Sequence, residues 1–269
     1  MKVSATELTE LCQKVFEGKG FPSGDYEDCA QAITWLEMHK FPILEQIERS
    51  LPQWDLSPSR PATPLFEDET VCVLDAHQND GLIYGSLALD LAYLKALSVG
   101  FAVVTLIRAQ HCQLIIPHIV QSTRRGANIV ASWCEGNQEH VITMALGEKY
   151  PYYTVTQRAA QSTSQSAGQS NSQPGSESNN QQHAQTLSIL CTTNVAFSQT
   201  FPNRGSGHSP LRCITPDDFA TFYQYHNEVG IEINESLWAK LVALSRNVLV
   251  ESTALSRLQG AGELSGGNG

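Results

Sequence analysis

Apolar positions near the start of the chain recur at helical spacing and predict a unit of three helices. Ser4 is followed three residues later by Glu7, a capping-box pattern, and the apolar stripe behind it predicts a first helix over 5–17. Glycines and a proline end that helix, and a second is predicted over 24–39. A third helix, with a proline in its first turn, is predicted over 42–52.

The next pattern is an apolar run, a polar turn, a long helical stretch and a second apolar run. Residues 71–74 and 101–107 have the continuous apolar character of buried strands, and the stretch between them predicts a helix of about 15–18 residues. A helical crossover is the usual connection between parallel strands. We therefore predict a parallel pair within a mixed sheet, with a site at the carboxyl end of a strand.

Shorter signals predict the remaining segments. They are a helix over 114–125 with a proline in its first turn, strands over 127–133, 141–146, 152–155 and 187–192, and helices over 215–228 and 236–251. Gln, Ser, Asn and Gly dominate 157–186, so this segment cannot offset the entropy cost of ordering and is predicted to be a disordered insertion. The predicted class is α/β. Its predicted parts are a helical unit (1–54), a strand-helix-strand core (65–156), the insertion (157–186), a C-terminal part of the same domain (187–257) and a flexible tail (258–269).

Charge and composition limit the partners. With 17 Lys and Arg against 27 Asp and Glu, the formal net charge is −10, which argues against a nucleic-acid partner. No apolar run approaches the roughly 18–20 residues of a membrane helix, and the amino terminus has no signal-peptide core, so we expect a cytoplasmic protein with no membrane partner. The seven cysteines are scattered without any CxxC pair, which predicts buried, reduced thiols.

A spaced set of residues runs through the first half of the chain. It consists of Val3-Ser4, Asp75, Gly81-Leu82, Ala88, Leu91-Ala92, Ala96, Gly100, His111 and Arg125-Gly126. In this set the chain resembles the type-2 malate/lactate dehydrogenases, the group that includes sulfolactate and ureidoglycolate dehydrogenases. The resemblance implies a truncated form of their fold. It also implies a homodimer, since those enzymes build their sites at a dimer interface.

A second resemblance covers nearly the whole chain. It rests on Gly18-Lys19-Gly20, Trp35-Leu36, Glu251-Ser252, Ser256-Arg257 and Gly260-Ala261-Gly262. In these motifs the chain is similar to an uncharacterised bacterial family, the domain of unknown function numbered 3726. That resemblance implies a fold and a bacterial origin, and it implies no mechanism.

The chain departs from the dehydrogenase pattern at two places. Where those enzymes carry an Asp-Ser-His-Gly segment and an arginine, this chain has Glu37-Met38-His39-Lys40-Phe41-Pro42. Past Trp133, their cofactor-lining region with a Gly-Thr-Asn-Pro run has no counterpart. Both departures favour a relative that has lost catalysis.

His111 is the residue that the dehydrogenase resemblance singles out. The resemblance implies that it is the acid/base for a hydroxyl that becomes a carbonyl, a role suited to a group that titrates near neutrality. Arg108 or Arg125 would then bind the substrate carboxylate, and NAD or NADP would be the cofactor. A structural histidine that caps the strand end is the alternative.

Other polar groups allow both a functional and a structural interpretation. Asp75 and the turn 78–81 could contact a ligand or simply lead into a helix. His39 and Lys40 could replace the missing catalytic segment or terminate a helix. Arg124 beside Arg125 could bind an anion or lie in solvent. The remaining set, His77, His111, Cys112 and His118, fits no dense metal motif, so no metal site is predicted.

The sequence leaves two functional hypotheses open. The first is a diverged, non-catalytic relative of the type-2 dehydrogenases that has a binding or accessory role with a small-molecule ligand. The second is an NAD(P)-dependent oxidoreductase that acts on a small 2-hydroxy acid. The tail 252–262 has small residues that could approach a neighbour or ligand closely, or it could be a loose terminus. Fold analogy alone does not choose between the hypotheses.

Overall fold

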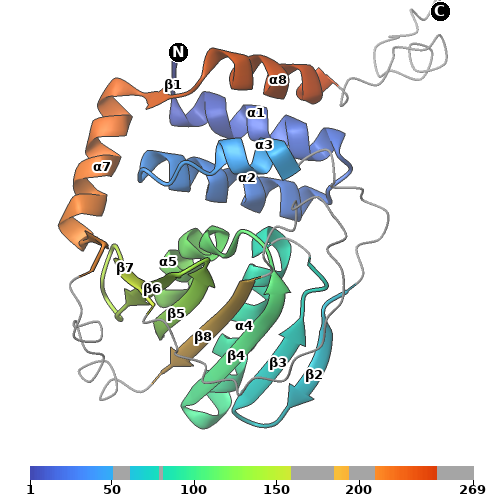
Figure 1. Cartoon of the computed structure of the whole chain (residues 1–269), viewed down its shortest axis with the longest axis vertical. Helices are drawn as coiled ribbons and strands as arrows, with labels where there is room; N and C mark the ends of the chain where they lie inside the picture. The colour runs from blue at the N-terminus through green and yellow to red at the C-terminus, as the bar shows by residue number, and fades with distance from the viewer. Residues whose placement is uncertain (51–60, 79–80, 159–184, 194–209, 247–269) are drawn as a thin grey trace, which may run out of the picture.

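The computed structural model has a mixed sheet below a layer of helices (Figure 1). It describes residues 1–50, 61–78, 81–158, 185–193 and 210–246. Several predictions therefore lie outside the described residues: most of the insertion 157–186, the turn residues Asn79 and Asp80, the end of the last predicted helix, and the tail with its 252–262 motif. None of the described helices is long and apolar enough to cross a membrane.

The three N-terminal helices are confirmed. They are α1 (Ala5–Gly18), α2 (Ser23–Met38) and α3 (Leu44–Ser50). The capping box of α1 is present, because the Glu7 amide donates to the Ser4 hydroxyl (3.2 Å) while the Ser4 amide donates to the Glu7 carboxylate (2.8 Å). Pro42 was expected in the first turn of α3 but precedes the helix. The Glu37 carboxylate accepts the Leu44 amide at 2.7 Å, which satisfies an N-terminal donor of the helix and helps to fix its start there.

The sheet has eight strands in the order β2-β3-β4-β8-β5-β6-β7-β9. They are β2 (Thr63–Glu67), β3 (Val71–Asp75), β4 (Phe101–Ala109), β5 (Asn128–Glu135), β6 (Gln138–Met144), β7 (Tyr152–Gln157), β8 (Gln185–Thr192) and β9 (Arg212–Ile214). The predicted parallel pairing of β3 with β4 is confirmed, and every other pair in this sheet is antiparallel. Strand β8, which follows the insertion, lies between β4 and β5.

Three features of the sheet were not predicted. Strand β2 is an exposed edge strand that carries Pro64, and a proline is tolerated there because an edge position does not need its missing N–H donor. Strand β9 has only three residues, too few for a sequence signal. Strand β6 begins three residues before the predicted start, because Gly136 (φ +58) forms a tight hairpin with β5.

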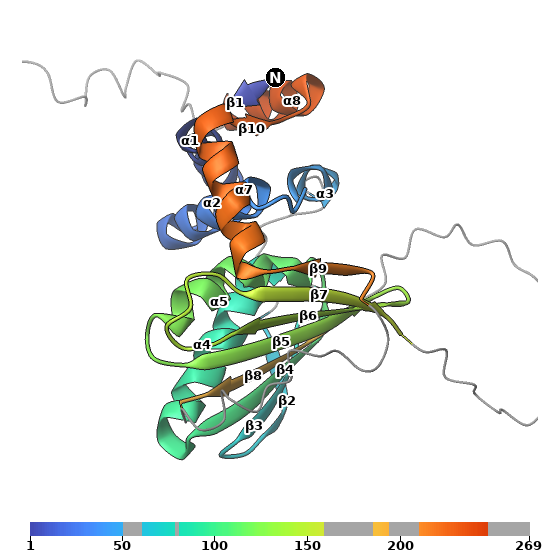
Figure 2. The same ribbon diagram turned by 90° about the vertical axis from the view of Figure 1, so that its left-hand side faces the viewer.

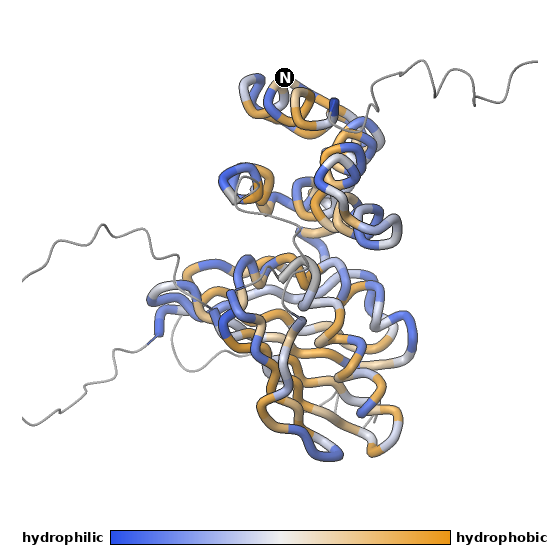
Figure 3. The backbone as a smooth tube through the Cα atoms, turned by 90° about the vertical axis from the view of Figure 1, so that its right-hand side faces the viewer, coloured by the Kyte–Doolittle hydropathy of each residue, from blue (hydrophilic) through white to orange (hydrophobic). Residues whose placement is uncertain are grey.

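Helices α4 (Gly81–Val99) and α5 (Ile116–Thr123) cover one face of the sheet (Figures 1 and 2). A short 3-10 helix, η2 (Cys112–Ile115), precedes α5, and the predicted proline lies at the start of α5. Alternate residues of the central strands are fully buried on this covered face, for example Ala102, Val104 and Leu106 of β4. Hydrophobic positions, orange in Figure 3, run through these strands.

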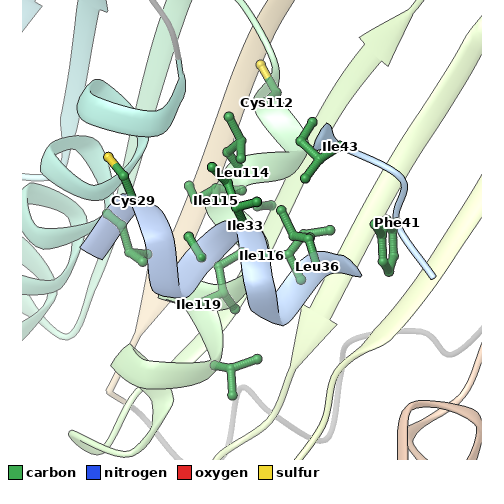
Figure 4. Packing of buried hydrophobic residues seen from close by; sticks show 14 of the residues in the cluster. Cys29, Ile33, Leu36, Phe41, Ile43, Cys112, Leu114, Ile115, Ile116 and Ile119 are labelled. Carbon is green, nitrogen blue, oxygen red and sulfur yellow. The ribbon is translucent and has the colours of Figure 1, made fainter. Parts of the chain in front are cut away.

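The helical layer rests on the sheet layer through α2, which crosses α5 and η2 (Figure 4). Ile33 and Leu36 of α2 lie beside Leu114, Ile116 and Ile119, and all five side chains are completely buried. Burying each such side chain stabilises the folded state by about 1.5–3 kcal/mol. This interface therefore fixes the position of the helical layer over one edge of the sheet.

The C-terminal segment returns to the helical layer. Helix α7 (Pro216–Val229) begins with a second capping box, in which the Asp218 amide donates to the Thr215 hydroxyl, and runs from the sheet edge to the top of the molecule. Helix α8 (Glu235–Ser245) then lies along α1 (Figure 1). Two short strands, β1 (Lys2–Val3) and β10 (Ile231–Glu232), pair antiparallel and join the two ends of the described chain.

The thiol prediction is confirmed at most positions. All seven cysteines are free, and Cys12, Cys29, Cys72, Cys112 and Cys191 are buried. Burial raises the pKa of Cys12 to about 12 and that of Cys191 to about 11, which keeps both thiols protonated and unreactive. Cys134 is half-buried and Cys213 is exposed on β9, so these two differ from the expectation.

Candidate functional site

The carboxyl ends of the parallel strands carry unusual backbone conformations. His77 (φ 53°) and Gln78 (φ 64°) follow β3, while Arg108 (φ 54°) and His111 (φ 49°) lie at the end of β4. The left-handed region costs a non-glycine residue about 1–2 kcal/mol. Such residues cluster at functional sites because the surrounding structure holds them in place. This edge of the sheet is therefore where a site is expected.

One group at this edge, the Asp75 cluster (Thr63, Asp75, His77 and Arg108), is held together by internal contacts. The Arg108 guanidinium forms a two-point ion pair with the Asp75 carboxylate, with Nε 2.9 Å from Oδ1. The Asp75 carboxylate also accepts the His77 amide at 2.9 Å. The His77 ring lies 3.4 Å from Arg108 through Nδ1 and 2.9 Å from the Thr63 hydroxyl through Nε2. Every member of the cluster thus has a partner within it.

Electrostatics supports a structural role for the Asp75 cluster. The hydrogen bond from Arg108, together with the His77 amide, lowers the pKa of Asp75 to about 2. The same ion pair raises the pKa of Arg108. Both groups stay charged at physiological pH and hold each other in place. The cluster fastens the end of β3 to the end of β4.

His111 lies beside a separate pocket of about 340 Å³, the His111 pocket. The residues that line it are Gln46, Arg49, Gln110, His111, Glu135, Gly136 and Gln185. The His111 side chain is buried, and its carbonyl accepts the Leu114 amide (3.0 Å) in the turn that starts η2. The Gln185 side chain accepts the Cys112 amide at 3.1 Å and so ties β8 to this turn. Three glutamines and one cation make the pocket polar.

A second pocket of about 220 Å³, the aromatic pocket, adjoins the first and shares Gln46 and Glu135 with it. Its lining comprises Phe41, Pro42, Ile43, Gln46, Gln113, Trp133, Glu135, His140, Tyr153 and Arg212. Strand pairing builds its floor, since Trp133 pairs with His140, His140 with Val155, and Val155 with Arg212 in one row across four strands. The loop 41–43 between α2 and α3 completes the lining.

Burial determines the protonation states of His140 and Tyr153 in the aromatic pocket. The His140 ring stacks on Trp133, with ring centroids 5.3 Å apart, and its Nδ1 lies 2.7 Å from the Tyr153 hydroxyl. Burial raises the pKa of Tyr153 to about 12. Burial also lowers the pKa of His140, against the opposing effect of Glu135. The pocket therefore holds a neutral imidazole and a protonated phenol at pH 7.

The structure separates the residues that the sequence proposed for one site. His111 lines a pocket, whereas Arg108 is engaged in the Asp75 cluster and Arg125, which follows α5, donates to Asp90 of α4 (3.0 Å) in an exposed pair. Neither arginine lines the His111 pocket, while Arg49, which the sequence did not single out, does. The roles of His111, Arg108 and Arg125 stay predictions.

The other candidates line neither of these two pockets. His39 is buried at the end of α2, stacks on Trp35 (3.9 Å) and donates through Nδ1 to the Trp35 carbonyl (2.6 Å). Desolvation lowers its pKa to about 4, so it is neutral. Lys40 lies over the Phe222 ring, and Arg124 is exposed. Among the described residues, no three His, Cys, Asp or Glu side chains are grouped to hold a metal ion.

Sequence reasoning missed the aromatic pocket. A local signal existed for half of it, because Gly136-Asn137 between two apolar runs predicts a two-residue hairpin, which would pair Trp133 with His140. The other half had no local signal. Phe41 and Arg212 are far apart in the chain and meet only because both the helical layer and β9 reach the same edge of the sheet.

With this geometry in place, the chain can be compared with known proteins. Residues 3–81 match the family described as protein of unknown function (DUF3726). The match covers α1 to α3 and the first strands, and it ends where α4 begins. No curated protein sequence matches the chain significantly.

Solved structures share the fold over most of its length. A dehydrogenase from Sinorhizobium meliloti aligns with a TM-score of 0.66 at 14% identity, over 91% of this chain and 99% of that one. Sulfolactate dehydrogenase from Methanocaldococcus jannaschii aligns with a TM-score of 0.64 at 14% identity, over 92% and 97%. A putative malate/lactate dehydrogenase from E. coli gives 0.64 at 12% identity, over 96% and 98%. The α/β, malate/lactate dehydrogenase-like fold is thus shown, and it extends beyond the first half that the sequence motif covers.

Proposed function

We propose that this protein is a non-catalytic relative of the dehydrogenases whose fold it shares, and that it binds a small carboxylate-bearing molecule in the His111 pocket. The observation that carries the proposal is the pocket itself, a polar hollow with a buried histidine at the carboxyl end of β4. In open α/β sheets, ligands bind beyond the carboxyl ends of the strands. Arg49 supplies a cation for a carboxylate, and Gln110 and Gln185 supply amides.

The chemistry of the pocket argues against a dinucleotide. A dinucleotide diphosphate carries two negative charges, whereas the pocket lining offers one cation, Arg49, and one carboxylate, Glu135. Its volume of about 340 Å³ is at the low end of small-molecule pockets, which span roughly 300–1,000 Å³. The described residues at this pocket therefore do not fit NAD or NADP, and we derive no step through either.

The alternative is an NAD(P)-dependent oxidoreductase that acts on a small 2-hydroxy acid, with His111 as acid/base and Arg108 or Arg125 on the substrate carboxylate. What favours it is the burial of His111 beside a pocket, together with the fold. Both proposed functions include a cytoplasmic location, a homodimer and a bacterial origin. Sedimentation analysis of the purified chain tests the homodimer directly.

Thermal-shift titration tests the proposal. The purified full chain is titrated with small hydroxy acids and oxo acids, and separately with NAD, NADH, NADP and NADPH. A ligand at 100 times its Kd stabilises the folded state by about 2.7 kcal/mol, which is easily seen. We expect a shift with a carboxylate and none with a dinucleotide.

Variants test whether the thermal shift comes from binding in the His111 pocket. His111→Ala should abolish the carboxylate shift, whereas His226→Gln, a matched change on α7 outside both pockets, should keep it. A clear shift with one dinucleotide would instead support the oxidoreductase. A carboxylate shift that survives in His111→Ala would rule out the His111 pocket as the site.

A further inference from the structure

The aromatic pocket contains polar atoms that the protein leaves unpaired. Six buried side-chain polar atoms of the described residues lack a hydrogen-bond partner, and three of them, Gln113 Oε1, Trp133 Nε1 and His140 Nε2, belong to residues that line this one pocket. Trp133 is 2% exposed and His140 is 8% exposed. A buried polar atom without a partner is rare and costs about 1–3 kcal/mol. Three in one pocket indicate a place for a polar ligand.

The two ring nitrogens act as donors. The indole Nε1 of Trp133 can only donate. The protonated Tyr153 hydroxyl can donate to Nδ1 of His140 at 2.7 Å, which leaves the hydrogen of the neutral imidazole on Nε2. The two rings are stacked, with an interplanar angle of 12°, and both residues line the pocket. Each ring therefore carries one donor that no protein acceptor uses.

Charges of both signs border the pocket. The Arg212 guanidinium lies over the Phe41 ring (5.3 Å) and the Tyr153 ring (5.9 Å), and one of its N–H groups reaches the Lys40 carbonyl at 3.3 Å. A guanidinium has five N–H donors, so others remain for a ligand. The Glu135 carboxylate lies 3.9 Å from His140 Nε2. The Gln113 amide oxygen, which has no hydrogen-bond partner, is a further acceptor among the residues that line this pocket.

We propose that the aromatic pocket binds a small zwitterion of the α-amino-acid type. Its carboxylate would lie on Arg212 and the N–H groups of Trp133 and His140, and its ammonium would face Glu135 and the amide oxygen of Gln113. A pocket of about 220 Å³ lined by Phe41 and Tyr153 has room for an apolar side chain beside the two charged groups. A ligand with only one charge would leave either Arg212 or Glu135 without a counterpart. The inference does not depend on the His111 pocket, because none of the proposed contacts involves His111 or Arg49.

The test is calorimetric titration of the full chain with the proteinogenic amino acids. The best-bound amino acid is then compared with two matched compounds, the carboxylic acid that lacks its ammonium and the amine that lacks its carboxylate. We expect one or a few amino acids to bind, and each matched compound to bind at least tenfold more weakly. An equal affinity for either matched compound, or no binding with a Kd below about 10 mM for any amino acid, would overturn the proposal.

Variants assign the binding to the pocket. Arg212→Gln and Glu135→Gln should each weaken binding at least tenfold, whereas Arg246→Gln, an exposed arginine at the end of α8, should leave it unchanged. Trp133→Phe keeps a ring but removes the N–H donor, so we expect a smaller loss, about three- to tenfold. His111→Ala should leave amino-acid binding intact, which separates this site from the carboxylate site. Unchanged binding in Arg212→Gln would refute the assignment.

Discussion

The Asp75 cluster and the aromatic pocket lie along the same edge of the sheet, yet their polar groups are used in opposite ways. In the cluster, the Asp75 carboxylate bonds to two nitrogens of the Arg108 guanidinium, so the two charges are already matched within the protein. In the pocket, Trp133 and His140 are both buried, and each keeps one ring nitrogen without a hydrogen-bond partner in the protein. The Asp75 cluster has the residue types of a functional site. The aromatic pocket instead has polar atoms without hydrogen-bond partners, which a ligand would supply.

This difference explains why residue type alone is a poor guide at this edge. An Asp, an Arg and a His at the ends of parallel strands are the residues that a search for catalytic groups would select. Their mutual contacts indicate a clamp between β3 and β4. Unsatisfied buried donors are invisible in the sequence, and they are the stronger pointer to a ligand.

Breaking the clamp should have the largest effect on stability. Asp75→Ala removes the partner of the Arg108 guanidinium and of the His77 amide at once, so we expect the lowest unfolding free energy of all the variants proposed for this edge. Chemical denaturation measures it, with Asp90→Ala as the matched control, because that carboxylate forms only an exposed pair with Arg125. A loss for Asp75→Ala no greater than for Asp90→Ala would contradict the structural role of the cluster.

His39 gives the next largest effect, and it is a pH effect. It is a buried histidine with an unpaired Nε2, like His140, but it lines neither pocket. Its folded-state pKa of about 4 lies below the ordinary 6.5, so as pH falls from 6.5 to 4 the unfolded chain takes up a proton that the folded protein does not. Stability from this group is complete above pH 6.5 and declines through that window by on the order of 3 kcal/mol.

Glu37 partly masks the His39 effect. Desolvation raises its pKa to about 7, so the folded protein retains a proton that the unfolded chain loses, and stability from this group falls as pH rises from 4.5 to 7. The His39 contribution is therefore measured as the difference between the natural chain and a His39 variant, since Glu37 is present in both. Unfolding free energies of the natural chain and of His39→Gln are compared from pH 4 to 7, and the variant should lose less stability on acidification. Parallel pH profiles would show that His39 does not titrate as proposed.

The hydroxyl of Tyr153 provides a smaller, local test of the pocket. Tyr153→Phe removes the one hydrogen bond to His140 Nδ1, and we expect a loss of about 1–2 kcal/mol in unfolding free energy. Tyr152→Phe is the matched control on the neighbouring position of β7, which points to the other face and is 40% exposed, and should change stability little. Equal effects of the two changes would mean that the bond to His140 contributes nothing.

The sequence predicted the elements better than their assembly. The helix cap at Ser4 and the parallel pair β3–β4 depend on residues close together in the chain, and each was found where it was expected. The insertion of β8 between β4 and β5 depends on contacts between segments more than 50 residues apart, which no local pattern encodes. His111 belongs to a local motif and could be singled out from the sequence. The aromatic pocket needs Phe41 and Arg212 together, and no local pattern predicts that contact.

Backbone strain at the edge yields the smallest expected effect. Gln78 is exposed and has φ 64°, and its amide donates to the Arg108 carbonyl (2.8 Å), a bond that glycine would keep. Gln78→Gly should relieve about 1–2 kcal/mol of left-handed strain, while glycine costs roughly 0.5–1 kcal/mol in unfolded-state entropy. We expect a net gain of about 0.5–1 kcal/mol in unfolding free energy, measured by chemical denaturation.

Arg108→Gly is the matched change that gives this prediction its meaning. Arg108 has nearly the same backbone conformation (φ 54°), so glycine relieves the same strain, but the variant also removes the ion pair with Asp75. If the clamp outweighs the strain, Arg108→Gly lowers stability although Gln78→Gly raises it. Two changes of the same sign would show that strain, rather than the Asp75 cluster, dominates the energetics of this edge.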